Sequence, residues 1–324
     1  MKILVTGAAG FIGSKLCTKL LENKKATIYG LDNLNTYYSI KIKKLRIDSL
    51  KKKKNFKFIK VDLKNHLNLK KLKSIPKIDI IYHFAAQAGV RFAIKEPQKY
   101  FNDNIKAFFN IINFAKEKKV KRFFFASSSS VYGDQKRFPI KENFELKTKN
   151  FYGLSKKIDE ICAETFSKIY NIKTVGLRFF TVFGEWGRPD MLIFKYLKAN
   201  LSKNKFYLNE NGEHFRDFTY IDDVISILTK LQNVKLKKNF SIFNVCSNNP
   251  IKIINVIKKI NKFNSKFKYI PIYSKALKKI EVDITHGNNN NLKNHLKNFK
   301  FSNFDKSLSK TVKWYMKNEI HKIT

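Results

Sequence analysis

The sequence predicts an α/β protein built on a doubly wound parallel sheet, with a smaller region toward its carboxyl end. Three observations predict this fold. Apolar strand-like runs alternate with helical patterns up to about residue 180, a glycine-rich turn joins the first run to the first helix, and the alternation then breaks down. Parallel strands are covered by helices on both faces, which explains why the runs are apolar throughout. We expect one domain over 1–180, to which about 214–247 returns, and a smaller region over 181–324.

Each predicted element follows from a local pattern. Strand-like runs rich in β-branched and aromatic residues lie at 2–6, 26–32, 55–62, 78–86, 121–129, 172–180 and 241–246. Apolar residues recur at helical spacing over roughly 11–23, around 104–118 and over 152–170. We expect 215–231 to be a loop that leads into a helix. The Asn- and Lys-rich stretch 286–298 is expected to be a solvated connection.

The charge of the chain does not by itself indicate a nucleic-acid partner. Lysine and arginine total 66 against 25 aspartate and glutamate residues, which gives a net charge of +41. Nearly all of these cations are lysines spread along the chain, whereas surfaces that read bases favour arginine. Lys, Asn, Ile and Phe all have A/T-rich codons, so a biased genome explains their joint excess; a real affinity for polyanions is the alternative. The few arginines are expected where a planar bidentate donor is needed.

The cysteines and the apolar runs indicate the compartment in which the protein is expected to work. Cys17, Cys162 and Cys246 are odd in number and far apart, so they predict neither a disulfide framework nor a metal cluster. A reduced, cytoplasmic compartment fits this usage. No apolar run approaches the roughly 20 residues that span a bilayer, so we expect no membrane insertion. His83 lies at an apolar strand end and is expected to be a core residue rather than a metal ligand.

The turn GAAGFIG is the first candidate site. It places Gly7, Gly10 and Gly13 directly after the first strand and at the start of the first helix. Glycines there allow close backbone approach to a pyrophosphate, and the helix N-terminus supplies free N–H donors and a positive dipole. Asp32 ends the second strand, where a carboxylate accepts hydrogen bonds from the ribose hydroxyls and repels a 2′-phosphate, so the sequence predicts NAD rather than NADP. Asp62, after the third strand, either touches the adenine edge or is a plain turn aspartate.

Tyr152 and Lys156 form the second candidate constellation, in NFYGLSKK at the head of a predicted helix. Their spacing puts both side chains on one helix face, one turn apart. A phenol, with an ordinary pKa of about 10, is a poor base at neutral pH. A fixed ammonium and a nicotinamide cation beside it would favour the phenolate. The strand end ASSSSVYG, residues 126–133, offers hydroxyls for a hydrogen bond to a reacting sugar hydroxyl.

Several segments together resemble a known family. TGAAGFIG, HFAAQAGVR, ASSSSVYG, YGLSK and RDFTYIDDV are similar to the extended short-chain dehydrogenase/reductases that act on nucleotide sugars. Residues 32–46 and 178–191 look most like the UDP-glucuronate 4-epimerases within it. The resemblance implies a Rossmann-type NAD-binding domain, a UDP-sugar substrate in the smaller region, and a homodimer paired through helices near 104–118 and 152–170. It also implies transient oxidation at sugar carbon 4, with the hydride then returned from NAD to the opposite face of the sugar.

The resemblance implies roles for individual residues. Tyr152 would be the general base for the 4-hydroxyl, Lys156 its electrostatic partner, and Ser128 the catalytic serine. The implied cofactor contacts are Gly7, Gly10, Phe11, Ile12, Gly13, Asp32, Asn33, Asp62, Leu63, Ala85, Ala86, Gln87, Asn104, Tyr152 and Lys156. The implied substrate contacts are Arg91, Ser129, Ser130, Thr181, Arg188 and Arg216.

Four of these substrate positions help to choose the subclass. Ser129 and Ser130 stand where the related 4,6-dehydratases and the UDP-glucuronate decarboxylase carry acidic residues, which argues against both activities. Thr181 stands where UDP-glucose-type epimerases usually have asparagine. Together with Arg188 it resembles the family's way of holding a C5 carboxylate and the phosphates, since arginine–carboxylate forks are strong contacts. The sequence therefore favours interconversion of UDP-glucuronate and UDP-galacturonate, which would supply an acidic sugar for surface polysaccharide.

The resemblance weakens after about residue 247. Ile280 and Glu281 replace the glycine and aspartate of the family's Gly-Asp-Val turn, so the uridine end lacks an anchor. Arg216 is expected at the UDP phosphates, with an ion pair to Asp217 or Asp222 as the alternative. Two other functions stay open: a 4-epimerase of UDP-glucose or a UDP-N-acetylhexosamine, and a non-catalytic polyanion or nucleic-acid binder on the same fold.

Overall fold

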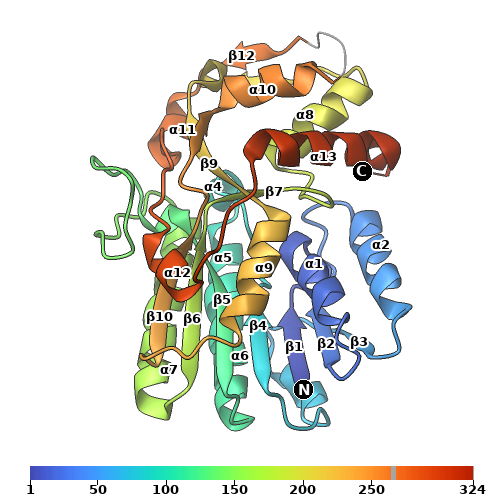
Figure 1. Ribbon diagram of the computed structural model, residues 1–324, viewed down its shortest axis with the longest axis vertical. Helices are drawn as coiled ribbons and strands as arrows, with labels where there is room; N and C mark the ends of the chain where they lie inside the picture. Colours follow the sequence, from blue (N-terminus) through green and yellow to red (C-terminus); the bar gives the residue numbers. More distant parts are fainter. Residues whose placement is uncertain (264–267, 324) are drawn as a thin grey trace.

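The computed structural model describes residues 1–263 and 268–323, and a seven-stranded parallel sheet forms its centre (Figure 1). Across the sheet the strands are β10 (Phe240–Val245), β6 (Lys173–Phe179), β5 (Arg122–Ser128), β4 (Ile80–His83), β1 (Lys2–Thr6), β2 (Thr27–Asp32) and β3 (Phe56–Lys60). The chain builds β2 and β3 on one side of β1, and β4, β5 and β6 on the other. The strand order therefore reverses beside β1, and the predicted doubly wound α/β fold is confirmed.

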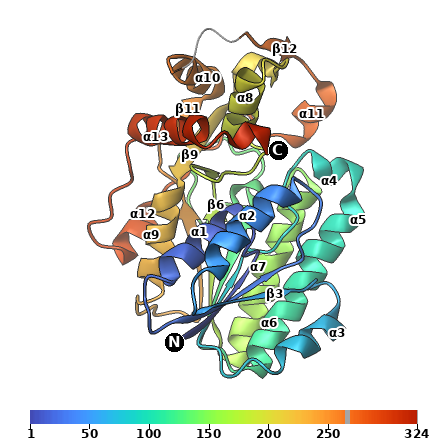
Figure 2. The same ribbon diagram turned by 90° about the vertical axis from the view of Figure 1, so that its right-hand side faces the viewer.

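Helices cover both faces of this sheet (Figure 2). One face carries α1 (Phe11–Leu20), α2 (Ile40–Lys51) and α9 (Ile221–Leu231), and the other carries α6 (Ala107–Glu117) and α7 (Phe151–Tyr170). Successive strand residues point to opposite faces. In β1, Ile3 and Val5 accordingly belong to the core that includes α1, whereas Leu4 belongs to the core that includes α6 and α7. Both faces are buried, which is why the strands are apolar throughout.

A second region lies beyond the carboxyl ends of the central strands (Figure 1). It contains a three-stranded sheet in the order β11 (Pro250–Lys252), β9 (Phe215–Tyr220), β7 (Thr181–Phe183), and a two-stranded sheet of β8 (Tyr207–Asn209) and β12 (Ile270–Ile272). Its helices are α8 (Leu192–Leu201), α10 (Ile253–Asn261), α11 (Lys275–Ile280) and α13 (Phe304–Lys317). Among the described residues, no helix combines the length and apolarity needed to cross a membrane.

The helix predicted around 104–118 forms by a less regular route. The short helices α4 (Phe92–Lys95) and α5 (Pro97–Tyr100) lead into a π-helical turn, η2 (Phe101–Lys106), and only then into α6. A further short helix, α3 (His66–Leu69), precedes β4. π-Turns are rare and often mark functional sites. This one lies at the edge of the candidate site described below.

Two expectations for the carboxyl half are wrong. The first part of 215–231 is strand β9 rather than a loop, because it pairs with β7 on one side and β11 on the other. Residues 286–298 are not a solvated connection, since they contain helix α12 (Asn290–His295), which packs beside β10. The Asn289 side chain is fully buried and its Nδ2 donates to the Cys246 carbonyl at 2.9 Å. An asparagine-rich stretch can thus be buried where its amides satisfy free backbone carbonyls.

Candidate active site

A cavity of about 830 Å³ opens at the carboxyl ends of the central strands, and residues of the second region complete its walls. Ligands of open α/β sheets bind at this position, beside the point where the strand order reverses. Nearly all the contacts predicted from the sequence line it: Gly7, Gly10, Phe11, Ile12, Gly13, Asp32, Asn33, Asp62, Leu63, Ala85, Ala86, Gln87, Arg91, Ser128, Ser129, Ser130, Tyr152, Lys156, Thr181, Arg188 and Arg216. The exception is Asn104, which lies behind the wall.

The glycine turn is tight, and side chains at its glycines would collide with neighbouring backbone. Gly7 has φ +70°, and a Cβ at this position would lie 2.8 Å from the backbone of Phe84 and Ala85. A Cβ on Gly13 would collide with the carbonyl oxygen of Gly7. Gly10 is the N-cap of α1 and has no side-chain cap, so the first N–H groups of the helix face the turn. This backbone cradle suits a pyrophosphate.

Asp32 is held at the end of β2 by backbone donors. Its Oδ2 accepts from Ala9 N at 3.1 Å and its Oδ1 from Leu34 N at 2.8 Å. Burial raises the pKa of Asp32, and the Leu34 N–H and the ammonium of Lys43 oppose that rise. The carboxylate is therefore fixed in place with lone pairs left for ribose hydroxyls.

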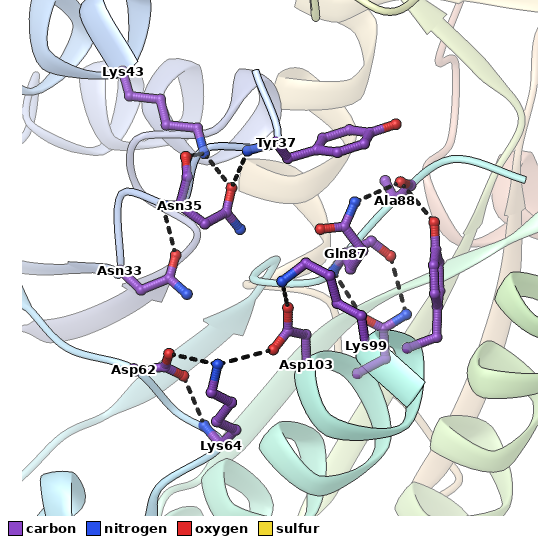
Figure 3. Close-up of polar contacts among 12 residues, drawn as sticks. Asn33, Asn35, Tyr37, Lys43, Asp62, Lys64, Gln87, Ala88, Lys99 and Asp103 are labelled. Carbon is purple, nitrogen blue, oxygen red and sulfur yellow. Dashed lines mark hydrogen bonds and ion pairs between the residues drawn. The ribbon is translucent and has the colours of Figure 1, made fainter. Parts of the chain in front are cut away.

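A buried lysine stands beside this carboxylate. Lys43 Nζ donates to both the carbonyl oxygen and Oδ1 of Asn35 at 2.6 Å, and Asn35 N donates to Asn33 Oδ1 at 3.1 Å (Figure 3). Burial lowers the pKa of Lys43 to about 8, although Asp32 acts in the opposite direction. Helix α2 thus brings a cation, held by Asn35 of the loop after β2, next to the carboxylate that is predicted to exclude a 2′-phosphate.

The predicted adenine end carries a small network of ion pairs (Figure 3). Asp62 Oδ2 lies 3.1 Å from Lys64 Nζ, which also lies 3.6 Å from Asp103 Oδ1. Lys99 Nζ contacts the other oxygen of Asp103 at 2.5 Å. Asp62 both lines the cavity and caps its own turn through Lys64 N at 3.2 Å, so both interpretations of this residue have a basis in the structure.

Asn104 supports the cavity wall instead of lining it. Its Oδ1 accepts from Gln87 N at 2.7 Å, and its Nδ2 donates to Gln87 O at 3.1 Å and to Ser155 Oγ at 2.9 Å. The π-helical turn η2 delivers this side chain. Asn104 therefore ties the loop after β4 to helix α7 and reaches a cofactor only through Gln87.

The predicted catalytic residues come from β5 and α7. Ser128 ends β5 with extended backbone, and its Oγ accepts from Ser130 N at 3.1 Å. Asn150 caps α7 by accepting from Gly153 N at 2.8 Å, which sets Tyr152 and Lys156 on the first turns of the helix. The Tyr152 ring meets that of Tyr100 edge-on, with centroids 6.2 Å apart.

Lys156 is deeply buried and already partnered. Its Nζ lies 3.0 Å from Asp159 Oδ2, and the two side chains are 2% and 1% exposed. Burial raises the pKa of Asp159 to about 7, although the Lys156 ammonium lowers it. Sequence reasoning did not identify Asp159; a carboxylate one turn after the lysine was the available signal.

At the predicted substrate end, Arg188 meets an acidic residue of its own loop. Its Nε and Nη2 contact the two oxygens of Asp190 at 3.0 and 2.5 Å. Tyr37 Oη donates to Asp190 Oδ2 at 3.1 Å. Although burial acts in the opposite direction, Arg188 holds the pKa of Asp190 below its ordinary value. Asp190 and Tyr37 both line the cavity, and both stood inside segments quoted for the resemblance, but neither was assigned a role.

Arg91 and Arg216 lie together near the loop that follows α11. Arg91 Nε contacts Glu281 Oε1 at 2.5 Å. Arg216 Nη1 donates to the carbonyl oxygens of Phe215 and Asp283, at 2.8 and 3.1 Å. Its predicted ion-pair alternatives are both engaged elsewhere: Asp217 accepts from backbone groups around Ser247, and Asp222 pairs with lysines. Glu281, in the segment where the resemblance thins, thus orients a predicted substrate arginine.

His83 and Trp186 lie outside the site and have structural roles. His83 is buried, and its Nδ1 lies 2.8 Å from Thr6 Oγ1, as expected of a core histidine. Trp186 packs on Trp314 with ring centroids 5.1 Å apart, and its carbonyl accepts from Arg46 Nη2 at 2.5 Å. It therefore anchors its loop. Within the described residues, no group of three His, Cys, Asp or Glu side chains is placed to hold a metal ion.

Comparison with known proteins identifies the family. Residues 3–246 match the model of the NAD-dependent epimerase/dehydratase family. Protein CapI of Staphylococcus aureus is 37% identical over 278 residues, which cover 80% of this chain and 82% of that protein. The UDP-glucuronate 4-epimerase of Thermodesulfobacterium geofontis is 33% identical over 321 residues, 97% of this chain and 96% of that one. The chain belongs to the NAD-dependent epimerase/dehydratase family, and the predicted resemblance is confirmed.

Solved structures agree with this assignment. The UDP-glucuronic acid 4-epimerase of Bacillus cereus, in complex with UDP-glucuronic acid and NAD, superposes with a TM-score of 0.88 at 30% identity, over 98% of this chain and all of that one. The cofactor of this chain is NAD. The glycine turn that lines the cavity and the fixed carboxylate of Asp32 fit a dinucleotide at the predicted place.

Proposed function

We propose that the protein is a UDP-glucuronate 4-epimerase, which interconverts UDP-glucuronate and UDP-galacturonate. One observation carries the proposal: the glycine cradle, the Ser128, Tyr152 and Lys156 side chains, and the predicted carboxylate-binding residues all line one cavity. The relatives and solved structures that carry this name support the same assignment. The proposal concerns the substrate; the chemistry at carbon 4 follows from the site.

Tyr152, Lys156 and Ser128 each have a separate role in the reaction at sugar carbon 4. Bound NAD supplies a hydride acceptor and donor, so the sugar is oxidised and then reduced at the same carbon with no net redox change. Tyr152 accepts the proton of the 4-hydroxyl and later returns it. Lys156 offers a positive charge that favours the phenolate, and Ser128 orients the sugar hydroxyl by a hydrogen bond. Inversion requires the sugar to turn within the cavity between the two hydride transfers.

The polar residues on the substrate side support a uronate. Thr181 and the pair Ser129 and Ser130 present hydroxyls without added negative charge, which suits a C5 carboxylate. Arg188 offers the N–H groups that Asp190 leaves free. Ser129 and Ser130 are uncharged where the related dehydratases and decarboxylase carry acidic residues, which supports epimerisation over elimination or decarboxylation.

One observation favours a second candidate. Asp190 already balances the charge of Arg188, so a neutral UDP-hexose would meet no uncompensated cation there. A 4-epimerase of UDP-glucose or a UDP-N-acetylhexosamine is therefore the alternative substrate class. Arg188→Leu separates the two: turnover of the uronate should collapse under the first proposal, and unchanged turnover would favour the neutral sugar.

The region around the central sheet and the second region would bind different ligands. Residues 1–180, together with about 214–247, are proposed to bind NAD, and residues 181–324 to bind the nucleotide sugar. The position of β10 in the central sheet and the packing of α9 on α1 support the return of the later segment. β9 lies at the boundary, because it pairs within the second region.

We also propose a homodimer formed through α6 and α7, which lie side by side on the outer face of the sheet (Figure 2). Phe109 and Ile161, one on each helix, are 53% and 56% exposed. Leu154 and Ile169 of α7 are also exposed. Exposed apolar patches of this kind mark interfaces. Ile161→Glu should yield a monomer in sedimentation equilibrium if this face is the interface.

The compartment and the use of the product are further proposals. Cys17, Cys162 and Cys246 carry free thiols, which supports a reducing compartment such as the cytoplasm. An epimerase there would supply UDP-galacturonate to the assembly of an acidic surface polysaccharide.

The direct test incubates the purified protein with UDP-glucuronate, UDP-glucose and UDP-N-acetylglucosamine and follows carbon-4 inversion by NMR, without added NAD. The proposal expects inversion of the uronate above all. Inversion of a neutral sugar alone would favour the second candidate. Tight, strongly salt-dependent DNA binding with no inversion of any sugar would favour a non-catalytic binder.

A further inference from the structure

A buried carboxylate stands one turn behind the proposed catalytic pair. Asp159 follows Lys156 by three residues on α7, and its Oδ2 lies 3.0 Å from the Lys156 ammonium. Its other oxygen, Oδ1, is also buried and has no hydrogen-bond partner among the described residues. A buried charge of this kind is retained only at a cost. Asp159 has no part in the proposed reaction at carbon 4.

We propose that Asp159 is a positioning residue that aims the Lys156 ammonium and sets the pH range in which Tyr152 can accept a proton. The inference rests on the proposed 4-epimerisation and adds a residue to it. An ammonium has three N–H donors. One is directed to Asp159, so the remaining two are left for the nicotinamide ribose and the Tyr152 phenol.

Two other titratable groups on α7, Glu160 and Cys162, are coupled electrostatically to Asp159. Glu160 makes a two-point ion pair with Arg178 of β6, through Nε at 2.9 Å and Nη2 at 2.7 Å, so its charge is balanced locally. Burial raises the pKa of Cys162, which keeps its thiol neutral. Asp159 differs from both, because burial raises its pKa to about 7.

His83, at the end of β4, is a further titratable group near the pair. His83 of β4 is coupled electrostatically to Lys156, and burial and that ammonium lower its pKa. His83 is therefore neutral, and its Nδ1 is engaged with Thr6 Oγ1. Asn104 from the π-helical turn carries no charge and contacts Ser155. The Lys156–Asp159 pair is thus the one whose net charge changes near neutrality among these neighbours.

Loss of the Asp159 charge should make it easier for Tyr152 to lose its proton. When Asp159 is ionised, it cancels much of the positive charge that Lys156 directs at Tyr152. Removing the carboxylate would leave that charge unbalanced in a site of low effective dielectric, which favours the phenolate. The proton of Tyr152 should then be lost at lower pH, by about one pH unit for a charge one helical turn away.

The test compares wild type with Asp159→Asn, both loaded with NAD. Asparagine keeps the size of the side chain and removes its charge. We expect the midpoint of tyrosinate absorption assigned to Tyr152, by subtraction of the Tyr152→Phe spectrum, to move about one pH unit lower. Burial raises the pKa of Tyr82 and Tyr132, so these phenols do not contribute in this range. The acid limb of the kcat profile should move in parallel.

Two controls make the result decisive. Glu164→Gln removes an exposed carboxylate from the same helix and should leave the midpoint unchanged. In a Lys156→Met background, Asp159→Asn should shift the midpoint by much less, because burial without the ammonium keeps Asp159 protonated and leaves no charge to remove. An unchanged midpoint in Asp159→Asn, or the same shift without Lys156, would overturn the proposal. If Asp159→Asn does not fold by circular dichroism, Asp159→Ala provides the same comparison.

The proposed function and this inference can fail separately. If wild type inverts no UDP-sugar, the proposed function is wrong, yet the tyrosinate titration still reports whether Asp159 controls Tyr152. If inversion occurs and both the titration and the acid limb are insensitive to Asp159→Asn, only the inference is wrong.

Discussion

Arg188 and Asp190 form a two-point ion pair inside the cavity, with Nε 3.0 Å from Oδ1 and Nη2 2.5 Å from Oδ2. The chain thus places its own carboxylate on the guanidinium that is proposed to hold the carboxylate of the sugar. Tyr37, from the loop after Asp32, the predicted ribose contact, also donates to Asp190. The arginine is therefore oriented before substrate arrives, and a uronate must share it or displace Asp190.

This relationship predicts the effect of Asp190→Asn. The substitution leaves the Arg188 charge unbalanced, so KM for UDP-glucuronate should fall by about tenfold at low ionic strength, in keeping with a charge-assisted contact. KM for UDP-glucose should change much less. Steady-state kinetics on both sugars measures the difference. Tyr37→Phe is the control, since it removes the Tyr37 hydrogen bond while the Arg188–Asp190 pair remains; equal effects of both variants on the uronate would contradict the prediction.

Tyr152→Phe should reduce carbon-4 inversion by about 10² to 10⁴-fold, the usual contribution of a positioned proton-transfer group. The ring is kept, including its edge-on contact with Tyr100, so the melting temperature should not change. Tyr170→Phe, at the exposed end of the same helix, is the matched control and should retain full activity. Near-normal inversion by the folded Tyr152→Phe protein would remove Tyr152 from the mechanism.

Asp32→Asn tests cofactor choice without measuring turnover. Loss of the negative charge removes the repulsion of a 2′-phosphate, and the nearby Lys43 ammonium then attracts it. The ratio of NADP to NAD affinity should rise by about tenfold or more, as measured by titration of protein fluorescence. Asp62→Asn, at the predicted adenine end, should alter affinity for both dinucleotides alike. A constant ratio in Asp32→Asn would mean that another group selects NAD.

The glycine turn and the place of Asp32 at the end of β2 could be predicted from the local sequence. Both depend on backbone geometry and on where a strand ends, which a short segment encodes. The partner of Arg91 was not predictable in the same way. Glu281 lies far from Arg91 in sequence, and only the packing of the second region against the cavity brings them together. The burial of Asn289 was missed because asparagine-rich stretches are usually solvated, whereas here the amides meet carbonyls at the end of the central sheet.

Asp222 links the two regions, because its Oδ1 lies 3.1 Å from Lys15 of α1 and its Oδ2 3.0 Å from Lys310 of α13. Although burial acts in the opposite direction, these lysines lower the pKa of Asp222. A carboxyl group with a lowered pKa stabilises the fold above its unfolded pKa of about 3.9, and this contribution is lost as the pH falls through the folded value.

Asp222→Asn should therefore lower the free energy of unfolding at neutral pH and low salt by about 0.5 kcal/mol, a value that allows for solvent screening of a side chain that is 39% exposed. The difference from wild type should vanish in acid and shrink in high salt, because both conditions remove the charge interaction. Urea unfolding across this pH range measures it. Asp48→Asn, exposed on α2, is the control. A difference that persists in acid would show that Asp222 acts through packing rather than charge.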